Sequence, residues 1–126
     1  MIQDRSLVTI ADNSGAKIGR IFKILGSTRK RYAEIGDLVV LSVQVAEPRK
    51  MVKKKEILTA VVVRQRKPLR RSDGSYIRFD DNAVVILAKN LKDPFEPKAN
   101  RVFGPIPREI VDLGYQKIGS LAPEVV

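Results

Sequence analysis

The sequence LVVLSVQVA, from Leu38 to Ala46, is the clearest strand pattern in the chain and decides its fold class. Apolar residues occupy every second position, and a period of two is the mark of a strand with one buried face. A second long pattern, from Ile57 to Val63, is an almost continuous β-branched run, which is typical of a strand covered on both sides. In the strand from Leu38 to Ala46, four apolar side chains share one face: those of Val39, Leu41, Val43 and Val45.

Shorter strand patterns flank these two. They cover residues 8–10, 18–24 and 83–87, and clusters of turn-forming residues separate them. Within 18–24 the apolar phase slips between Gly19 and Ile21, which predicts a bulge or a sharp bend. Several short strands at this spacing favour a small antiparallel β-barrel over an open sheet, because closure removes exposed strand edges. The predicted fold is therefore mainly β.

Two segments extend this barrel. Residues 65–79 are polar and basic, and the sequence SDGS at 72–75 is a hairpin turn signal at their centre. In the proline-rich tail, Pro107 to Gly114 predicts a short helix with proline at its start and glycine past its end, and residues 115–121 predict a further helical turn or two. We expect a single domain over 1–126, with the barrel and its ribbon in about 1–90 and a C-terminal loop and short helices in about 91–126.

Composition narrows the function. The 126 residues include neither cysteine nor histidine, which excludes a disulfide framework, a zinc finger, a thiol nucleophile and the usual general base. A net charge of +10, from 24 Lys and Arg against 14 Asp and Glu, indicates a surface for a polyanion: nucleic acid, an anionic membrane or an acidic protein. No apolar run approaches the roughly 18 residues of a membrane span, and the N-terminus lacks a signal peptide pattern. We therefore expect a soluble protein.

The basic residues gather in three clusters, each in a predicted loop or hairpin. One cluster is as consistent with a solvated loop as with a binding site, but three on so small a chain favour polyanion binding. A membrane-surface helix would need apolar residues at helical spacing, and the clusters have none. Arginine grips phosphate through two hydrogen bonds, and such contacts position a protein on an RNA backbone without reading bases. The candidate RNA-binding residues are Arg29, Lys30 and Arg31; Arg49, Lys50, Lys53, Lys54 and Lys55; and Arg64, Arg66, Lys67, Arg70, Arg71 and Arg78.

Aromatic residues are few and widely spread, whereas single-strand binders display several rings on one sheet face. The strand phase predicts that Phe22 and Phe79 lie in the core. Tyr32 and Tyr76 stand beside basic residues and are candidates to stack on an exposed base.

Catalytic signals are almost absent. Asp80 and Asp81 are adjacent, so a strand would direct them to opposite faces, and a turn explains them better. No glycine-rich phosphate loop is present, and we expect neither an enzyme nor a cofactor nor a metal. Two alternatives stay open beside a structural RNA-binding protein. A chaperone of the cold-shock type needs rings on one face, and an RNA-processing enzyme with a metal needs clustered acids in a cleft.

Several motifs are shared with a known family. They include AVVV at 60–63, the basic stretch that follows, and Asp73-Gly74, Phe79, Asn82 and Val85-Ile86. ADNSGA at 11–16, RYA at 31–33, FGP at 103–105 and SLAPEV at 120–125 extend the match over essentially the whole chain. In these residues and their spacing the chain resembles the family of ribosomal protein fourteen of the large subunit, in its bacterial or organellar branch.

The resemblance implies a five-stranded antiparallel barrel with a projecting ribbon, here residues 65–79, and short C-terminal helices. It implies a structural constituent of the large ribosomal subunit that binds large-subunit rRNA directly and reaches small-subunit rRNA in an intersubunit bridge. Ribosomal proteins three and nineteen would be neighbours, and we expect neither DNA nor a membrane as a partner. Because the match begins at Met1, we expect no cleavable presequence and a ribosome in the bacterial cytoplasm or an organelle interior.

The resemblance also implies a contact with the ribosomal silencing factor, which blocks subunit joining, near Asn100, Arg101 and Lys117. The chain departs from the family pattern in two loops. Ala99-Asn100 stands where Gly-Thr is usual, and residues 90–98 are richer in proline and charge. Lys55-Glu56 replaces a common Gly-Asp before the strand that starts at Ile57.

Overall fold

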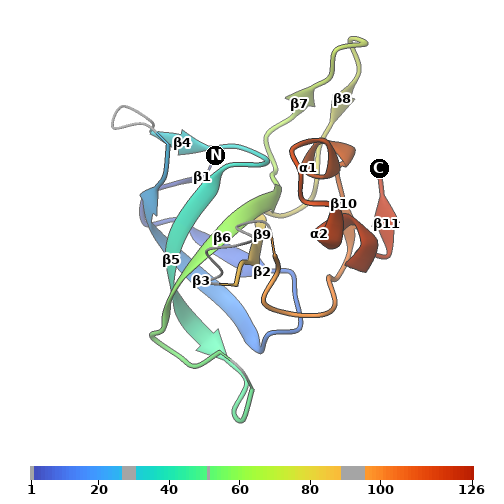
Figure 1. Cartoon of the computed structure of the whole chain (residues 1–126). Coiled ribbons are helices and arrows are strands. Elements are labelled where there is room, and N and C mark those ends of the chain that lie inside the picture. Colours follow the sequence, from blue (N-terminus) through green and yellow to red (C-terminus); the bar gives the residue numbers. More distant parts are fainter. Residues whose placement is uncertain (1, 27–30, 51, 89–95) are drawn as a thin grey trace.

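Five strands close into a barrel in the computed structural model, which describes residues 2–26, 31–50, 52–88 and 96–126. The order of neighbouring strands around the barrel is β2, β3, β5, β6 and β9 (Figure 1). This confirms the mainly β barrel that the period-two patterns predicted. The barrel strands are β2 (Leu7–Ile10), β3 (Ala16–Ile24), β5 (Leu38–Ala46), β6 (Ile57–Arg64) and β9 (Ala83–Ile86).

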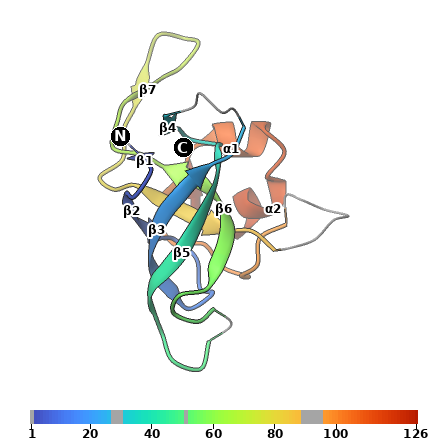
Figure 2. The same cartoon turned by 90° about the vertical axis from the view of Figure 1, so that its left-hand side faces the viewer.

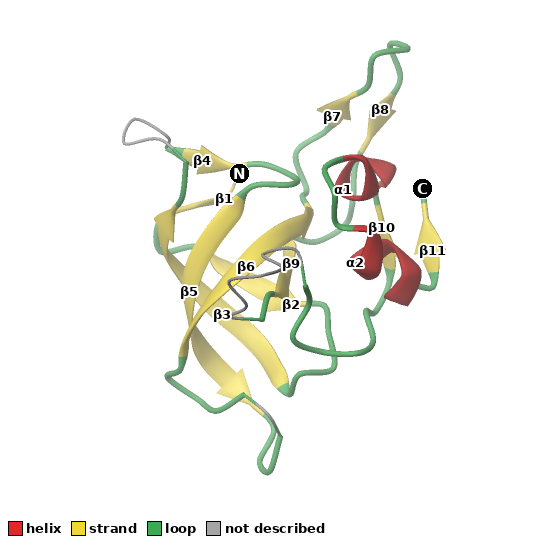
Figure 3. Cartoon of the chain, in the orientation of Figure 1, coloured by secondary structure: helices red, strands yellow, loops and turns green. Residues whose placement is uncertain are grey.

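Short strand pairs and two helices complete the described part of the chain (Figure 3). The pair β7–β8 forms a ribbon that projects from one end of the barrel, as expected for residues 65–79 (Figure 1). Helix α1 forms where the proline and glycine signals predicted it, and α2 lies within residues 115–121, where a further helical turn or two was expected. The bounds are β1 (Ile2–Gln3), β4 (Tyr32–Ala33), β7 (Leu69–Arg70), β8 (Tyr76–Ile77), β10 (Pro105–Ile106), α1 (Arg108–Asp112), α2 (Gln116–Leu121) and β11 (Glu124–Val125).

One strand pairing in the barrel is parallel, which corrects the expectation of a fully antiparallel barrel. Strands β2 and β9 run in the same direction, with Thr9 opposite Ala83 and Ile10 opposite Val84. The four other neighbouring pairs are antiparallel. The reason is geometric, because strand direction cannot alternate all the way around a closed ring with an odd number of strands. One parallel pair is the minimum that five strands allow.

Strand β6 separates two hydrophobic cores, as its continuous apolar pattern predicted. Ala60 and Val62 face the barrel interior, whereas Val61 and Val63 face outward and are equally buried. The outward side chains pack in a second cluster with residues of the C-terminal segment, including Ile110 of α1. Because consecutive strand side chains point to opposite faces, one strand supports both the barrel and the C-terminal helices.

Strand β3 bends, but not where the sequence placed the slip. Its register with β5 shifts before and after Ile18 and again between Ile21 and Lys23. Ile21 is fully buried, so the adjacent Phe22 points to the other face of the strand and is 45% exposed. The prediction that Phe22 lies in the core is therefore wrong. On β5 the buried face ends at Val43, because Val45, which pairs with Ile18, is 44% exposed. Phe79 is buried, as predicted.

Asp12, expected only as a turn residue, is a buried anchor. Its carboxylate accepts hydrogen bonds from the Ser14 hydroxyl at 2.6 Å and from the Ile86 backbone N–H at 3.0 Å. These bonds join the β2–β3 turn to β9. Burial raises the pKa of Asp12 above its ordinary value of 3.8, although the hydrogen bonds from Ser14 and Ile86 act in the opposite direction.

Candidate nucleic-acid interface

The basic segments project from opposite ends of the barrel. The ribbon rises from one end, and the loop between β5 and β6 extends from the other, as both views show (Figures 1 and 2). The predicted clusters are therefore not brought into one patch. A barrel with a basic prong at each end suits a partner large enough to contact both, and a folded RNA is such a partner.

The ribbon is a tight hairpin around the predicted turn. Arg70 pairs with Tyr76, and the backbone N–H of Arg71 donates to the Ser75 carbonyl at 2.8 Å. Gly74 has a φ of +88°, a conformation that glycine adopts without steric cost. The carboxylate of Asp73 accepts hydrogen bonds from the Ser75 hydroxyl and N–H, which lower the pKa of Asp73. The turn therefore uses its single acid internally, beside the exposed cations.

The exposed cations of the ribbon and its base are Arg66, Lys67, Arg70 and Arg78. Arg66 is held in place, because its backbone N–H donates to Asn82 Oδ1 at 2.9 Å and its Nε donates to the Asp80 carbonyl at 2.9 Å. Arg70 and Arg78 belong to opposite arms of the hairpin. The ribbon thus presents guanidinium groups that are open to a phosphate ligand.

Two predicted RNA-binding arginines are instead paired inside the chain. Arg64 is only 8% exposed, and its guanidinium contacts Asp81 at 3.1 Å and donates to the Phe103 carbonyl at 3.1 Å. Arg71 forms a bidentate pair with Glu109, with distances of 2.7 and 3.2 Å. Their partners lie 17 and 38 residues away, so local sequence could not reveal them. The structure therefore gives both arginines an internal structural role.

The β5–β6 loop exposes its whole predicted cluster. Its tip is supported by Val52, which is fully buried, and by the Glu56 carboxylate, which accepts from the Lys53 N–H at 3.1 Å. Lys55 has a φ of +70°, so this lysine adopts the left-handed conformation that favours glycine. The turn conformation is thus compatible with the Gly-Asp that Lys55-Glu56 replaces. The exposed cations of this loop are Arg49, Lys50, Lys53, Lys54 and Lys55.

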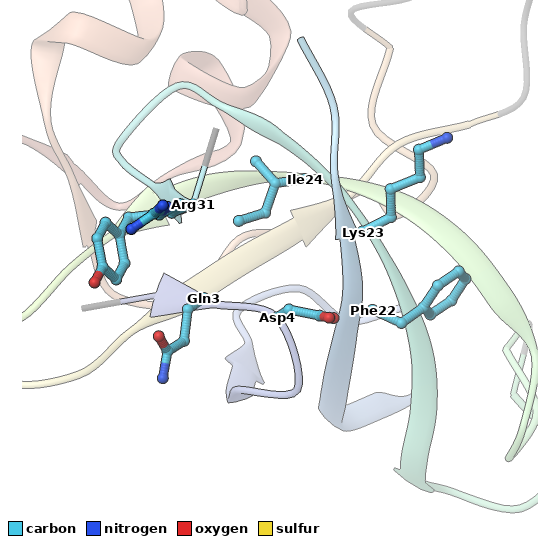
Figure 4. Close-up of a pocket in the computed structure, with 7 residues that line it drawn as sticks. Gln3, Asp4, Phe22, Lys23, Ile24 and Arg31 are labelled. Atoms are coloured by element: carbon cyan, nitrogen blue, oxygen red, sulfur yellow. The ribbon is translucent and has the colours of Figure 1, made fainter. Parts of the chain in front are cut away.

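The third cluster is described only at Arg31, because Arg29 and Lys30 lie outside the described residues. Arg31 is exposed and lines an open pocket of about 410 Å³ together with Gln3, Phe22 and Lys23. Figure 4 shows the side chains of Phe22 and Lys23 directed away from Arg31. The pocket therefore does not clamp a base between Phe22 and Arg31.

The three residues predicted to contact a silencing factor lie on two elements. Asn100 and Arg101 are exposed in the loop before β10, and Lys117 is exposed on α2. Asn13 fixes the loop: its side-chain amide donates to Asn100 Oδ1 at 2.8 Å, and its backbone N–H donates to the Arg101 carbonyl at 3.2 Å. The departure at Ala99-Asn100 is accommodated, since Ala99 is buried and Asn100 is hydrogen-bonded.

Exposed cations also lie outside the predicted clusters, on surfaces that belong neither to the ribbon nor to the β5–β6 loop. Arg20 and Lys23 on β3 point outward, and Arg5 is exposed before β2. They are isolated in the sequence, so no charge run marked them. Among the described residues no group of three or more acids is placed to hold a metal ion, and no helix there is long and apolar enough to cross a membrane.

A comparison with protein-family models identifies a family that matches the whole sequence. The model of ribosomal protein L14p/L23e matches residues 1–126. The matched range includes the barrel, the ribbon and the C-terminal helices. This is a family of structural proteins of the large ribosomal subunit rather than of enzymes. The chain therefore belongs to the ribosomal protein L14p/L23e family and is a structural constituent of the large ribosomal subunit.

Proposed function

We propose that this protein binds large-subunit rRNA directly, through the basic ribbon at one end of the barrel and the basic β5–β6 loop at the other. The observation that carries the proposal is the exposure of every described cation in these two projections except Arg71. A net charge of +10 supplies the long-range attraction for RNA. The outer face of β6, by contrast, packs against the chain's own C-terminal helices and is not exposed to a partner.

The contacts are proposed to be made to the backbone rather than to the bases. Arginine side chains such as Arg70 and Arg78 can bind a phosphate through two parallel hydrogen bonds, and the loop lysines act as point charges. Phosphate contacts fix the position and orientation of a protein but carry no base information. This protein would therefore recognise the shape of its rRNA site.

The family supports finer proposals about partners. The projecting ribbon and loop leave surface for a bridge to small-subunit rRNA, and ribosomal proteins three and nineteen are the proposed protein neighbours. For the silencing factor the proposed contact stays at Asn100, Arg101 and Lys117. The proposed location is the ribosome of a bacterial cytoplasm or an organelle interior.

A cold-shock type of RNA chaperone is less well supported. Such a protein needs several rings on one sheet face. The exposed rings in the described chain instead come from separate elements: Phe22 on β3, Tyr32 on β4, Tyr76 on the ribbon and Phe103 before β10.

Subunit sedimentation tests the proposal. A tagged wild-type chain is expected to travel with large subunits through a high-salt wash. The variant Arg70→Glu/Arg78→Glu should incorporate at least about tenfold less, because reversing two charges replaces attraction with repulsion at the phosphates. Binding of the isolated chain to a large-subunit rRNA fragment should fall about a thousandfold between roughly 50 and 200 mM salt if six to ten phosphates are contacted.

The matched control is Arg20→Glu/Lys23→Glu, which makes the same charge change on β3, outside the proposed surface. It should incorporate nearly as well as wild type. Equal losses in the two variants would indicate a response to net charge alone. Normal incorporation of the ribbon variant would overturn the ribbon as an RNA anchor, and a flat salt response would point to a protein partner.

A further inference from the structure

The ribbon is too short to hold its own direction. Strands β7 and β8 pair through only two residue positions, Leu69 with Ile77 and Arg70 with Tyr76. An isolated two-stranded hairpin is marginally stable in water. Its base is fastened by Gln65, whose side-chain oxygen accepts from the Ile35 N–H at 3.1 Å and whose carbonyl accepts from the Phe79 N–H at 3.1 Å. These bonds lie below β7 and β8, so the outer half needs another support.

Arg71 supplies a support at the outer end of β7. Its guanidinium binds both carboxylate oxygens of Glu109 in α1, and Nη2 also donates to the Val126 carbonyl at 2.7 Å. The Arg71 side chain is 14% exposed and that of Glu109 is 29% exposed, so the pair is shielded from water more than a surface ion pair. A bidentate pair of this kind fixes orientation as well as distance.

Packing does not replace this connection. A pocket of about 610 Å³ opens between the ribbon and the C-terminal segment, lined by Ile77 and Arg78 from the ribbon and by Pro105 and Val126 from the tail. The space between β8 and the C-terminal segment is therefore not filled by side chains. Figure 1 shows α1 beside the base of the ribbon, and the ion pair joins α1 to Arg71, the residue that follows the outer end of β7.

We propose that the Arg71–Glu109 pair is a latch that sets the direction of the ribbon, so that Arg71 acts as a positioning residue and not as an RNA ligand. The latch holds Arg70 and Arg78 in the positions where they contact phosphates. Helix α1 can hold the ribbon in place because its residue Ile110 is buried in the second hydrophobic core. This inference rests on the proposed function for its consequence in the ribosome, but the latch itself is a property of the free chain.

A charge swap separates positioning from direct binding. Arg71→Glu and Glu109→Arg should each reduce incorporation into large subunits about threefold or more, because each places two like charges together. The double variant Arg71→Glu/Glu109→Arg should recover most of the loss. As a matched control, Arg70→Glu should gain nothing from Glu109→Arg. If the double variant incorporated as poorly as Arg71→Glu although its ribbon kept the wild-type direction, Arg71 would contact RNA itself, and the latch would be rejected.

A second readout does not depend on rRNA. Because the chain has no cysteine, spin labels can be placed at Tyr76→Cys on the ribbon and Gln116→Cys on α2, both exposed positions. Electron paramagnetic resonance on the free chain should give a narrow distance distribution, broadened by Arg71→Glu and narrowed again by the charge swap. An unchanged distribution in Arg71→Glu would overturn the latch. A latch confirmed here, with no binding of the wild-type chain to large subunits, would instead reject the proposed function.

Discussion

At the scale of single residues, the basic segments contain two kinds of arginine: exposed arginines and arginines paired with an acid of the same chain. Arg64 and Arg71 belong to basic runs whose residues look alike in the sequence. In the structure each of the two forms an ion pair with an acidic residue of a distant segment. The acidic partners, Asp81 for Arg64 and Glu109 for Arg71, determine which arginines are paired. Neither acid is near its arginine in the sequence. Removing one partner of such a pair leaves an uncompensated, partly buried charge and destabilises the fold. Arg70 and Arg78, by contrast, are exposed.

Asp12 gives a pH-dependent prediction at the same scale. Because burial raises its pKa, the folded chain binds the Asp12 proton more tightly than the unfolded chain does. The resulting contribution to stability is complete below pH 3.8 and is lost as the pH rises through the raised pKa. Asp12→Asn cannot titrate. The difference in unfolding free energy, wild type minus Asp12→Asn, should therefore decrease as the pH is raised from about 3 to 7.

Urea unfolding of both chains across this pH range checks the prediction. Ser14→Ala is the control, because it leaves the carboxyl group in place and should retain a pH dependence of the same sign. A difference that instead grew with pH would show that hydrogen bonds to the Asp12 carboxylate outweigh its desolvation.

At the scale of elements, period-two patterns located the barrel strands because half-buried strands alternate their side chains. The two-sided burial of β6 was equally readable, since its run of β-branched residues leaves no polar face. The outward turn of Phe22 was not readable. Register shifts in β3 depend on how it pairs with β5, and that pairing is a long-range property that spacing alone does not encode.

The β5–β6 loop carries a prediction of its own. Lys55 stands at a φ of +70°, where a side chain costs roughly 1–2 kcal/mol and glycine costs little. Glycine also raises the conformational entropy of the unfolded chain, and this effect offsets about 0.4–1 kcal/mol of the gain in stability. Lys55→Gly should therefore stabilise the free chain by up to about 1.5 kcal/mol.

Thermal and urea unfolding of the free chain measure this change. Lys54→Gly is a matched control, because the neighbouring lysine does not have a positive φ and should lose stability on the same substitution. If both variants were destabilised equally, the strain assigned to Lys55 would be absent.

At the scale of the whole molecule, two features matter most: the barrel is closed, and its two basic projections lie at opposite ends. Five strands force one parallel contact, between β2 and β9, and the closed barrel then holds the ribbon and the β5–β6 loop at opposite ends. The sequence identified both basic segments but not their separation, because their positions follow from how the barrel closes. The proposed rRNA site must therefore extend along the molecule rather than form one patch.

Tethered hydroxyl-radical probing tests this arrangement most directly. An iron chelate attached at Ser72→Cys in the ribbon turn, or at Lys54→Cys in the β5–β6 loop, would be incorporated into large subunits, with the cysteine-free chain treated alike as the background. Each site should cleave its own set of rRNA nucleotides, and the two sets should be distinct. Cleavage from only one site, or from neither above background, would contradict an rRNA-binding protein that grips its partner at both ends.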